Sequence, residues 1–346
     1  MKKVVAALIV LMFSVNVFAA ETKTITVDDA VTKAFNNSNE IKKLQESAYL
    51  TEQNHDKLLE NFYMAGGTEA GISAAVALTR NEIDSALSLP NITSQKTGLK
   101  ITISRYFTAI LSAEADLELY TKQLEIEKKE LVISAVRTKL GQMSKSEYEG
   151  LETAYNKNAA NKTAKERAIA DAYTNLNTIM GTSDNYKIVP PDIRYEELKN
   201  TNLVGYINTA LDTNIKIKQS LENYRAQKYE YDITIFDDSL SKETAEIKMN
   251  QAQRDLEDQK TNLTNTLSSN YDDIKNLELA VKLAKDDYEN MEKQMKIKQT
   301  QLQIGKTTQI DVDKYALEME NAKNDITNKE YEHFIKVMTF QNADII

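Results

Sequence analysis

The stretch LTNTLSSNYDDIKNLELAVKLAKDDYENMEKQM, residues 263–295, decides the fold of this chain. Its apolar side chains recur at intervals of three or four, which is the a/d seam of a coiled coil sustained over more than four heptads. No glycine or proline occurs from 244 to 303, so the sequence predicts one helix of about 60 residues, about 90 Å long. The seam residues are Leu263, Leu267, Tyr271, Ile274, Leu277, Val281, Ala284, Tyr288, Met291 and Met295.

A second seam of the same kind precedes this one. Its one polar member, Glu127, is expected to cost stability or to set the register of the helices. The 346 residues include only 9 glycines and 3 prolines, which excludes a turn-rich β-sandwich or a barrel of many short strands. We therefore expect an all-α fold of long antiparallel coiled-coil hairpins. The second seam consists of Ile110, Ala113, Leu117, Tyr120, Leu124, Glu127 and Leu131.

The composition leaves little room for chemistry. The chain has no cysteine and two histidines, which excludes disulfides, thiol catalysis and cysteine- or histidine-rich metal sites. His55 and His333 lie in charge-rich helical stretches, so we expect both at the surface. The net charge of −9 argues against nucleic acid or an anionic membrane surface as partner. No phosphate-binding loop, HExxH run or G-x-S-x-G elbow occurs, so we expect no catalytic residue, no cofactor and no enzymatic activity.

Residues 1–19 have the pattern of a secretory signal peptide. Lys2 and Lys3 precede an apolar run at 4–15, and a small-residue pattern predicts cleavage after Ala19. The alternative is an uncleaved N-terminal anchor, although the run is shorter than the ~20 residues of a spanning helix. No second run of spanning length follows, so we expect the mature chain to cross no membrane as a helix.

Two short interruptions of the helical pattern look alike: KLGQMS at 139–144 and QIGKTT at 303–308. Each has an aliphatic residue, a glycine directly after it and a hydroxyl residue three positions later. Glycine ends a helix because it accepts a positive φ, and the hydroxyl residue caps the next helix. Each interruption is thus predicted to be a tight helix-turn-helix tip, and Glu147 would complete a capping box at the first. The tip residues are Leu140, Gly141 and Ser144 in the first, and Ile304, Gly305 and Thr308 in the second.

The two tips belong to an internal repeat. At an offset of 164 residues, apolar positions match without a gap over a stretch of about 75 residues, which includes the pair Leu176 and Phe340. The chain is therefore predicted to be two copies of one helical unit, at 25–181 and 195–346. The linker between them, 182–194, contains two consecutive prolines, which suit a stiff non-helical connector.

A tandem repeat of this kind resembles the TolC-type outer-membrane efflux proteins. The match rests on four elements that follow the family's order and together cover nearly all of the mature chain. They are the opening Val27-Asp28-Asp29-Ala30, repeated from Leu203; the helix start Arg105-Tyr106-Phe107; the tips Leu140-Gly141 and Ile304-Gly305; and Ile310-Asp311-Val312.

The resemblance implies a homotrimer in which twelve helices close into a hollow tube. The family also carries four barrel strands per chain, in the middle of each repeat. Here 72–89 has a helical pattern, and 231–236 is followed almost at once by helix-forming sequence. A spanning strand needs ~9–11 residues of alternating pattern. We therefore expect a TolC-like α-barrel protomer without a substantial β-barrel.

At the tips, the resemblance implies an acidic aperture and an ion-pair network that close the tunnel. Asp311 matches one acidic position of the aperture, and Glu147 keeps an acidic partner of the network. Lys314 and Thr307 replace the family's second acid and its arginine, so this latch is incomplete. The alternative for Asp311 is a solvated acid in the first turn of a helix, which the helix dipole stabilises.

Two functions remain open at this point. The first is a TolC-like efflux or export component, a trimeric conduit that docks to a membrane-fusion adaptor of a multidrug or type I secretion-like pump. That pump would also include a transporter of the inner or cytoplasmic membrane. The second is a non-transporting coiled-coil scaffold or spacer of the cell envelope. The repeat and its tips favour the first. The signal peptide predicts the cell envelope in either case: the outer membrane by resemblance, or a periplasmic or cell-wall-associated place without barrel strands.

Overall fold

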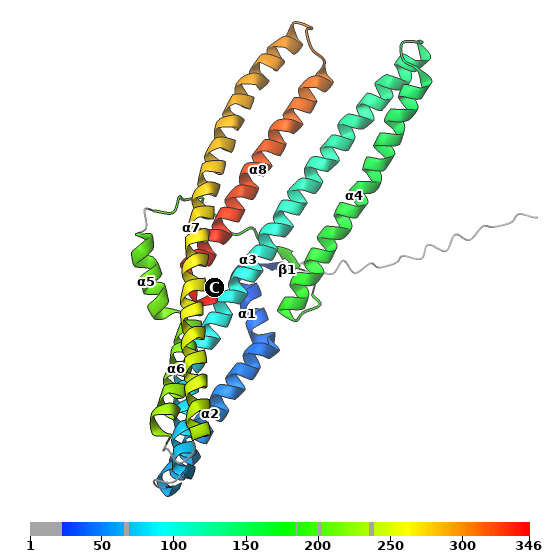
Figure 1. Cartoon of the computed structure of the whole chain (residues 1–346). Coiled ribbons are helices and arrows are strands. Elements are labelled where there is room, and N and C mark those ends of the chain that lie inside the picture. Colours follow the sequence, from blue (N-terminus) through cyan, green and yellow to red (C-terminus); the bar gives the residue numbers. More distant parts are fainter. Residues whose placement is uncertain (1–22, 66–68, 185, 200–201, 235–238) are drawn as a thin grey trace, which may run out of the picture.

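The structure is a computed structural model that describes residues 23–346 apart from 66–68, 185, 200–201 and 235–238 (Figure 1). The predicted signal peptide lies outside the described residues. The described part forms two short strands, eight α-helices and one 3-10 turn. In chain order they are β1 (Lys23–Ile25), α1 (Val27–Asn37), α2 (Asn39–Ala65), α3 (Glu69–Lys139), α4 (Lys145–Met180), β2 (Tyr186–Ile188), α5 (Leu203–Thr213), α6 (Ile215–Ile233), α7 (Ser239–Gln303), α8 (Gln309–Gln341) and the turn η1 (Ala343–Ile345).

The helices occur in the same order in the two halves of the chain. α1 to α4 have 11, 27, 71 and 36 residues, and α5 to α8 have 11, 19, 65 and 33. In each half the last two helices form an antiparallel hairpin, and both hairpins, α3–α4 and α7–α8, point to the same end of the molecule (Figure 1). The other ends of α3 and α7 pack against α2 and α6.

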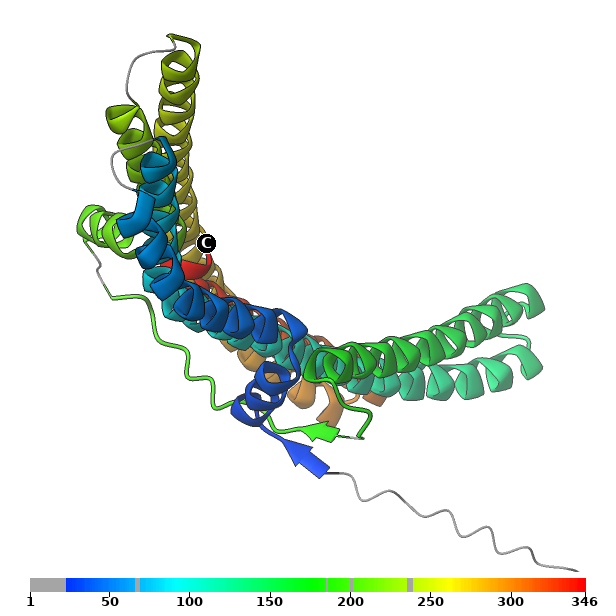
Figure 2. The same cartoon turned by 90° about the horizontal axis from the view of Figure 1, so that it is seen from below.

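The two halves are joined through α3. This helix packs against α8 in the hairpin half of the molecule and against α6 in the opposite half. The hairpin half is therefore a layer in the order α4–α3–α8–α7, with α4 and α7 at its edges. The whole layer is curved, and β1, β2 and the extended segment after β2 lie on its convex side (Figure 2).

The long helices agree with the seams. α7 includes the whole predicted stretch from 244 to 303, and α3 includes 72–89, where we expected a helix. α3 continues through Pro90, which removes a hydrogen bond to the carbonyl of Ala86; both residues are exposed, so water can satisfy that carbonyl. The end of the segment 231–236, where we expected no room for barrel strands, lies outside the described residues. Among the described residues, no helix combines the length and apolar character that a membrane span needs.

Each hairpin is anchored in its own hydrophobic core. The first core contains Phe107 and Leu176, both fully buried, and the second contains Leu267 and Phe340. Leu176 and Phe340 are the pair matched by the repeat offset, so the two cores occupy equivalent places. Burial along the α7 seam decreases towards the tip, where Met295 is only half-buried. The packing that holds each hairpin is therefore strongest near its base.

The parallel pair of strands β1 and β2 is not predicted by the sequence pattern. Thr24 lies opposite Lys187, and Ile25, Tyr186 and Ile188 are buried in the first core. Three residues per strand are too few to show a period-two alternation. The predicted linker at 182–194 therefore begins with a strand that pairs with the start of the first repeat.

The expectation that His333 lies at the surface is wrong. The residue is 3% exposed, its ring lies 4.9 Å from the ring of Tyr195, and its Nε2 lies 3.4 Å from Glu278 Oε1. The sequence around position 333 is charged, but this face of α8 is turned towards α7 and the linker. The His55 side chain is 40% exposed.

Candidate functional site at the hairpin tips

The first tip is a glycine-terminated helix end. Gly141 has a φ of 72°, and its N–H donates to the Thr138 carbonyl at 3.1 Å. The N–H of Gln142 reaches back to the Arg137 carbonyl at 2.8 Å. This pair of backward hydrogen bonds is the Schellman motif, which requires a left-handed residue after the helix. The sequence prediction for Gly141 as a helix terminator is confirmed.

The second tip has the same hydrogen bonds at an offset of 164 residues. Gly305 has a φ of 69°, and its N–H donates to the Leu302 carbonyl at 3.0 Å. The N–H of Lys306 donates to the Gln301 carbonyl at 2.8 Å. The two turns are therefore the same structure built twice.

Both tips continue into a capped helix. Ser144 Oγ accepts the N–H of Glu147 at 3.2 Å, and Glu147 Oε2 accepts the N–H of Ser144 at 2.9 Å. Thr308 and Asp311 form the same reciprocal pair, with both distances 3.2 Å. The sequence reading missed the second capping box because an aspartate stands where the motif has glutamate or glutamine.

The two acids of the tips are thus committed to their own helix starts. The backbone and side-chain hydrogen bonds from Ser144 hold the pKa of Glu147 below its usual range. The hydroxyl and N–H of Thr308 and the hydroxyl of Thr307 do the same for the pKa of Asp311. Both carboxylates are exposed and lie in the first turn of a helix. This is what the alternative for Asp311, a solvated acid stabilised by the helix dipole, predicts. An aperture role for Glu147 and Asp311 stays a prediction.

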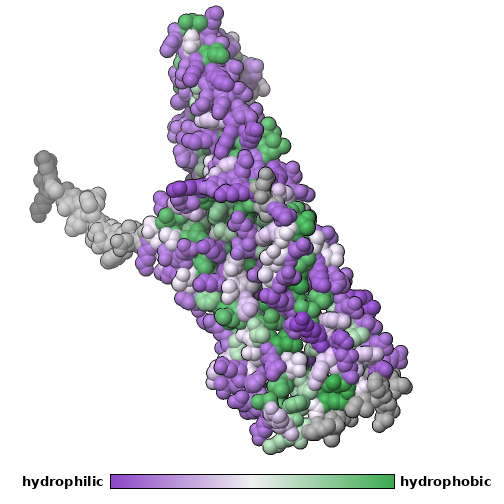
Figure 3. Space-filling model, turned by 90° about the vertical axis from the view of Figure 1, so that its left-hand side faces the viewer, coloured by the Kyte–Doolittle hydropathy of each residue, from purple (hydrophilic) through white to green (hydrophobic). Residues whose placement is uncertain are grey.

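An exposed aliphatic residue stands before each tip glycine. Leu140 is 66% exposed and Ile304 is 60% exposed. One heptad earlier, Ile133 and Ile297 are each 49% exposed, so both α3 and α7 present the same pair on one helix face. The sequence reading did not single out Ile133 and Ile297. Most of the surrounding hairpin surface is hydrophilic, with scattered apolar side chains (Figure 3).

Near the tips, the two hairpins touch through charged side chains. Lys129 of α3 pairs with Asp313 of α8 at 2.8 Å, and two turns earlier Lys122 pairs with Glu320 at 2.7 Å. Lys314, which replaces an acid in the family pattern, pairs with Glu130 at 2.5 Å. These side chains are partly or largely exposed to solvent, which screens such pairs, so each contributes little to stability. The contact between the hairpins is therefore weak here.

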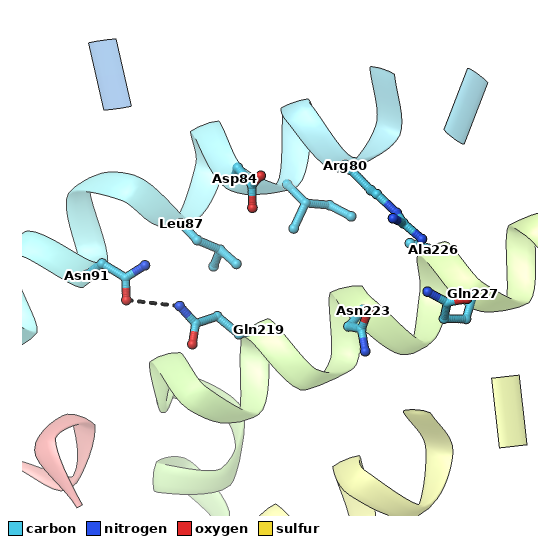
Figure 4. A pocket seen from close by; sticks show the side chains of 9 residues that line it. Arg80, Asp84, Leu87, Asn91, Gln219, Asn223, Ala226 and Gln227 are labelled. Atoms are coloured by element: carbon cyan, nitrogen blue, oxygen red, sulfur yellow. Dashed lines mark hydrogen bonds between the residues drawn. The ribbon is translucent and has the colours of Figure 1, made fainter. Parts of the chain in front are cut away.

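A separate cleft of about 400 Å³ lies between α3 and α6, at the end opposite the tips (Figure 4). Asp84 and Leu87 project into it from α3, and Gln219 of α6 donates to Asn91 at 3.0 Å across it. Four of its nine lining residues are carboxamides, and the lining includes no histidine, serine, threonine or cysteine. The described residues hold no cluster of three or more histidine or carboxylate side chains that could bind a metal.

We compared the sequence and the fold of this chain with those of known proteins. Neither a family model nor a curated protein matches the sequence. Solved structures match the fold. CusC, which forms a transmembrane channel, has a TM-score of 0.71 at 8% identity, with 93% of each chain covered. The CmeC outer membrane channel of Campylobacter jejuni has 0.71 at 11%, with 92% of this chain and 85% of CmeC covered. The open-state MtrE outer membrane channel of Neisseria gonorrhoeae has 0.64 at 11%, with coverage of 92% and 89%.

The chain has the TolC-type fold. The resemblance read from the repeat and the tips is thereby confirmed, as is the prediction of long helices paired into hairpins without a substantial sheet. At 8–11% identity the similarity concerns the fold. Within this TolC-type fold, the matched turns at Gly141 and Gly305 are the best candidates for a functional surface, because both repeats build the same exposed structure there.

Proposed function

We propose that this protein is the conduit of an efflux or export pump and that three chains assemble into a closed tube of helices. The observation that carries the proposal is the pair of identical tips on a TolC-type fold. In such a trimer, six tips ring one end of the tube. They dock to a membrane-fusion adaptor, which in turn joins a transporter of the inner or cytoplasmic membrane.

The edges of the helical layer support the trimer. α4 and α7 each lack a neighbour on one side of the layer α4–α3–α8–α7. Both carry exposed aliphatic side chains, with Leu151 39% exposed on α4 and Leu279 and Leu283 above 50% on α7. Leu279 and Leu283 lie one turn apart on the same face of α7, and adjacent exposed apolar side chains are suited to an interface. Packing α4 of one chain against α7 of the next buries these side chains and closes a ring.

The tips are suited to a helical partner. A glycine beside each exposed aliphatic residue lets another helix come close, and the pair one heptad apart matches the apolar repeat of a coiled coil. An adaptor with a helical hairpin therefore fits. The alternative is that Gly141 and Gly305 have only the structural role of ending helices. It explains both glycines but not the exposed Leu140 and Ile304 before them.

The experiment is the double variant Gly141→Glu and Gly305→Glu, tested for co-purification with a membrane-fusion adaptor from the same cells. An added Cβ meets nothing within 4 Å at either glycine, so only the positive φ costs stability, about 1 kcal/mol per site. Gly150→Glu is the matched control, because Gly150 is exposed, also has open space and has no positive φ. Loss of the adaptor in the double variant alone is expected. A folded, trimeric double variant that still retains the adaptor contradicts docking at the tips.

Two observations distinguish the scaffold alternative from the conduit: the neighbouring genes and the oligomeric state. Neighbouring genes for an adaptor and a transporter, together with a trimer in sedimentation at micromolar concentration, favour the conduit. A monodisperse monomer without such neighbours favours the spacer. As a pump component the protein belongs to the cell envelope, and an outer-membrane place follows only from the resemblance.

A further inference from the structure

The segment that joins the two halves is held by side chains of α7. Residues 189–199 form no helix or strand, and from here on the linker means this segment, which extends beyond the predicted bounds 182–194. The N–H of Leu198 donates to Glu278 Oε1 at 2.6 Å, and the carbonyl of Leu198 accepts from Lys275 Nζ at 2.7 Å. Lys275 also bonds Glu278 Oε2 at 2.8 Å. Both backbone groups of one linker residue are thus bound to one helix, in an arrangement we call the linker clamp (Leu198, Lys275 and Glu278).

The centre of the linker clamp, the carboxylate of Glu278, is buried. Glu278 is 7% exposed, and His333 of α8 approaches it from the other side. Burial alone raises the pKa of Glu278, but hydrogen bonds from Lys275, Leu198 and His333 outweigh this and hold it below its usual value. The ring of Tyr195 covers the site, with Lys285 over that ring at 4.6 Å. A buried charge with these partners is costly to unpair.

The other end of the linker is fixed in the first core. β2 ends at Ile188, whose backbone hydrogen-bonds the hydroxyl of Tyr173, and that hydroxyl donates to Glu114 at 2.9 Å. Glu114 and Glu278 are repeat equivalents at the offset of 164. Only ten residues separate Ile188 from Leu198, so the linker spans at most about 35 Å between its two anchors.

We propose that the linker clamp sets how far apart the two hairpins stand, because it ties the core of the first hairpin to the base of the second. Each hairpin is a stiff rod with an apolar seam, and near the tips the two hairpins are linked by the partly exposed ion pairs of Lys122, Lys129 and Lys314. Glu278 of the clamp lies at the base of the second hairpin, 25 residues before the end of α7 at Gln303. At 1.5 Å per residue this lever is about 37 Å, so a rotation of about 5° at the base moves a tip by about 3 Å.

The test measures the distance between the tips. The chain has no cysteine, so Gln142→Cys and Lys306→Cys, both exposed and repeat-equivalent, carry the only two spin labels. Labelled chains are diluted into unlabelled ones so that each assembly holds one pair. Glu278→Gln keeps the shape but removes the charge, and its amide NH2 faces either the N–H of Leu198 or the ammonium of Lys275, so one of these two donors loses its acceptor. We expect the mean distance to shift by about 3 Å or more, or the distribution to double in width.

Two further variants keep the proposal falsifiable. Glu289→Gln, an exposed acid on the same helix, is the matched control and should leave the distribution unchanged. Four Gly-Ser residues inserted after the exposed Asp192 slacken the linker without touching either anchor, and should broaden the distribution as Glu278→Gln does. An unchanged distribution in either the slackened or the folded Glu278→Gln chain overturns the proposal. If Glu278→Gln loses its helical circular dichroism, the slackened chain decides alone.

Discussion

Gly141 and Gly305 stand 164 residues apart and have nearly the same backbone conformation, with φ values of 72° and 69°. Each is followed three residues later by a hydroxyl residue that caps the next helix through the same reciprocal bonds. A turn that recurs in such detail indicates that both copies kept one local solution for reversing a long helix. We make four predictions, on the tip glycines, the helix caps, the pH dependence of stability and the two hydrophobic cores.

The first concerns the tip glycines themselves. Gly141→Ala should lower the free energy of unfolding by about 1 kcal/mol, because alanine pays a steric cost at positive φ. Gly150→Ala in the interior of α4 should raise it by about 0.5–1 kcal/mol, because alanine is the better helix former. Urea unfolding of the two variants beside the parent checks both signs. Equal effects at the two positions would contradict the left-handed turn.

The second concerns the caps. Ser144→Ala and Thr308→Ala each remove the oxygen that accepts an N–H at 3.2 Å, and each should cost about 1 kcal/mol. The two sites lie on different hairpins and share no partner, so the double variant should show the sum of the single effects. Denaturant midpoints test this. A Ser144→Thr variant keeps the cap and should stay close to the parent.

The third concerns pH. Glu147 and Asp311 have lowered pKa values in the folded chain, so more protons bind to the unfolded state as the pH falls. Their contribution is fully present above their ordinary values near 4 and is lost as the pH falls through the lowered values. Thermal melts between pH 7 and pH 2 should show this loss. Glu147→Gln with Asp311→Asn should flatten that part of the profile, and an equally steep fall in the double variant counts against the capping assignment.

The fourth concerns the two cores. Phe107 is 0% exposed and Phe340 is 1% exposed, so replacing either by alanine leaves a cavity. Each substitution should cost about 3–5 kcal/mol. Leu283→Ala, on the exposed edge of α7, should change the stability of the isolated chain little and instead weaken assembly. Unfolding curves and sedimentation separate the two effects, and a small cost at Phe340 would place the second core elsewhere.

The longest seam and the two tips can be predicted from patterns between residues that are close in sequence. The seam from Leu263 to Met295 predicts α7 because a heptad repeat is a property of neighbouring turns of one helix. The glycines and hydroxyl residues of the tips predict helix ends for the same reason, since a cap bonds only residues within one turn. His333 could not be placed this way, because its neighbours in sequence are charged while its ring faces α7 and the linker.

By itself, the sequence predicted the long helix α7, the helical pattern of 72–89 and the two reversals at Gly141 and Gly305, since each depends on spacings of a few residues. Only the tertiary structure decided that α3 lies beside α8, that Thr24 pairs with Lys187 and that Glu278 binds Leu198. These contacts join residues about 80 or more positions apart. Their partners are chosen by how the helices pack, which no local periodicity encodes.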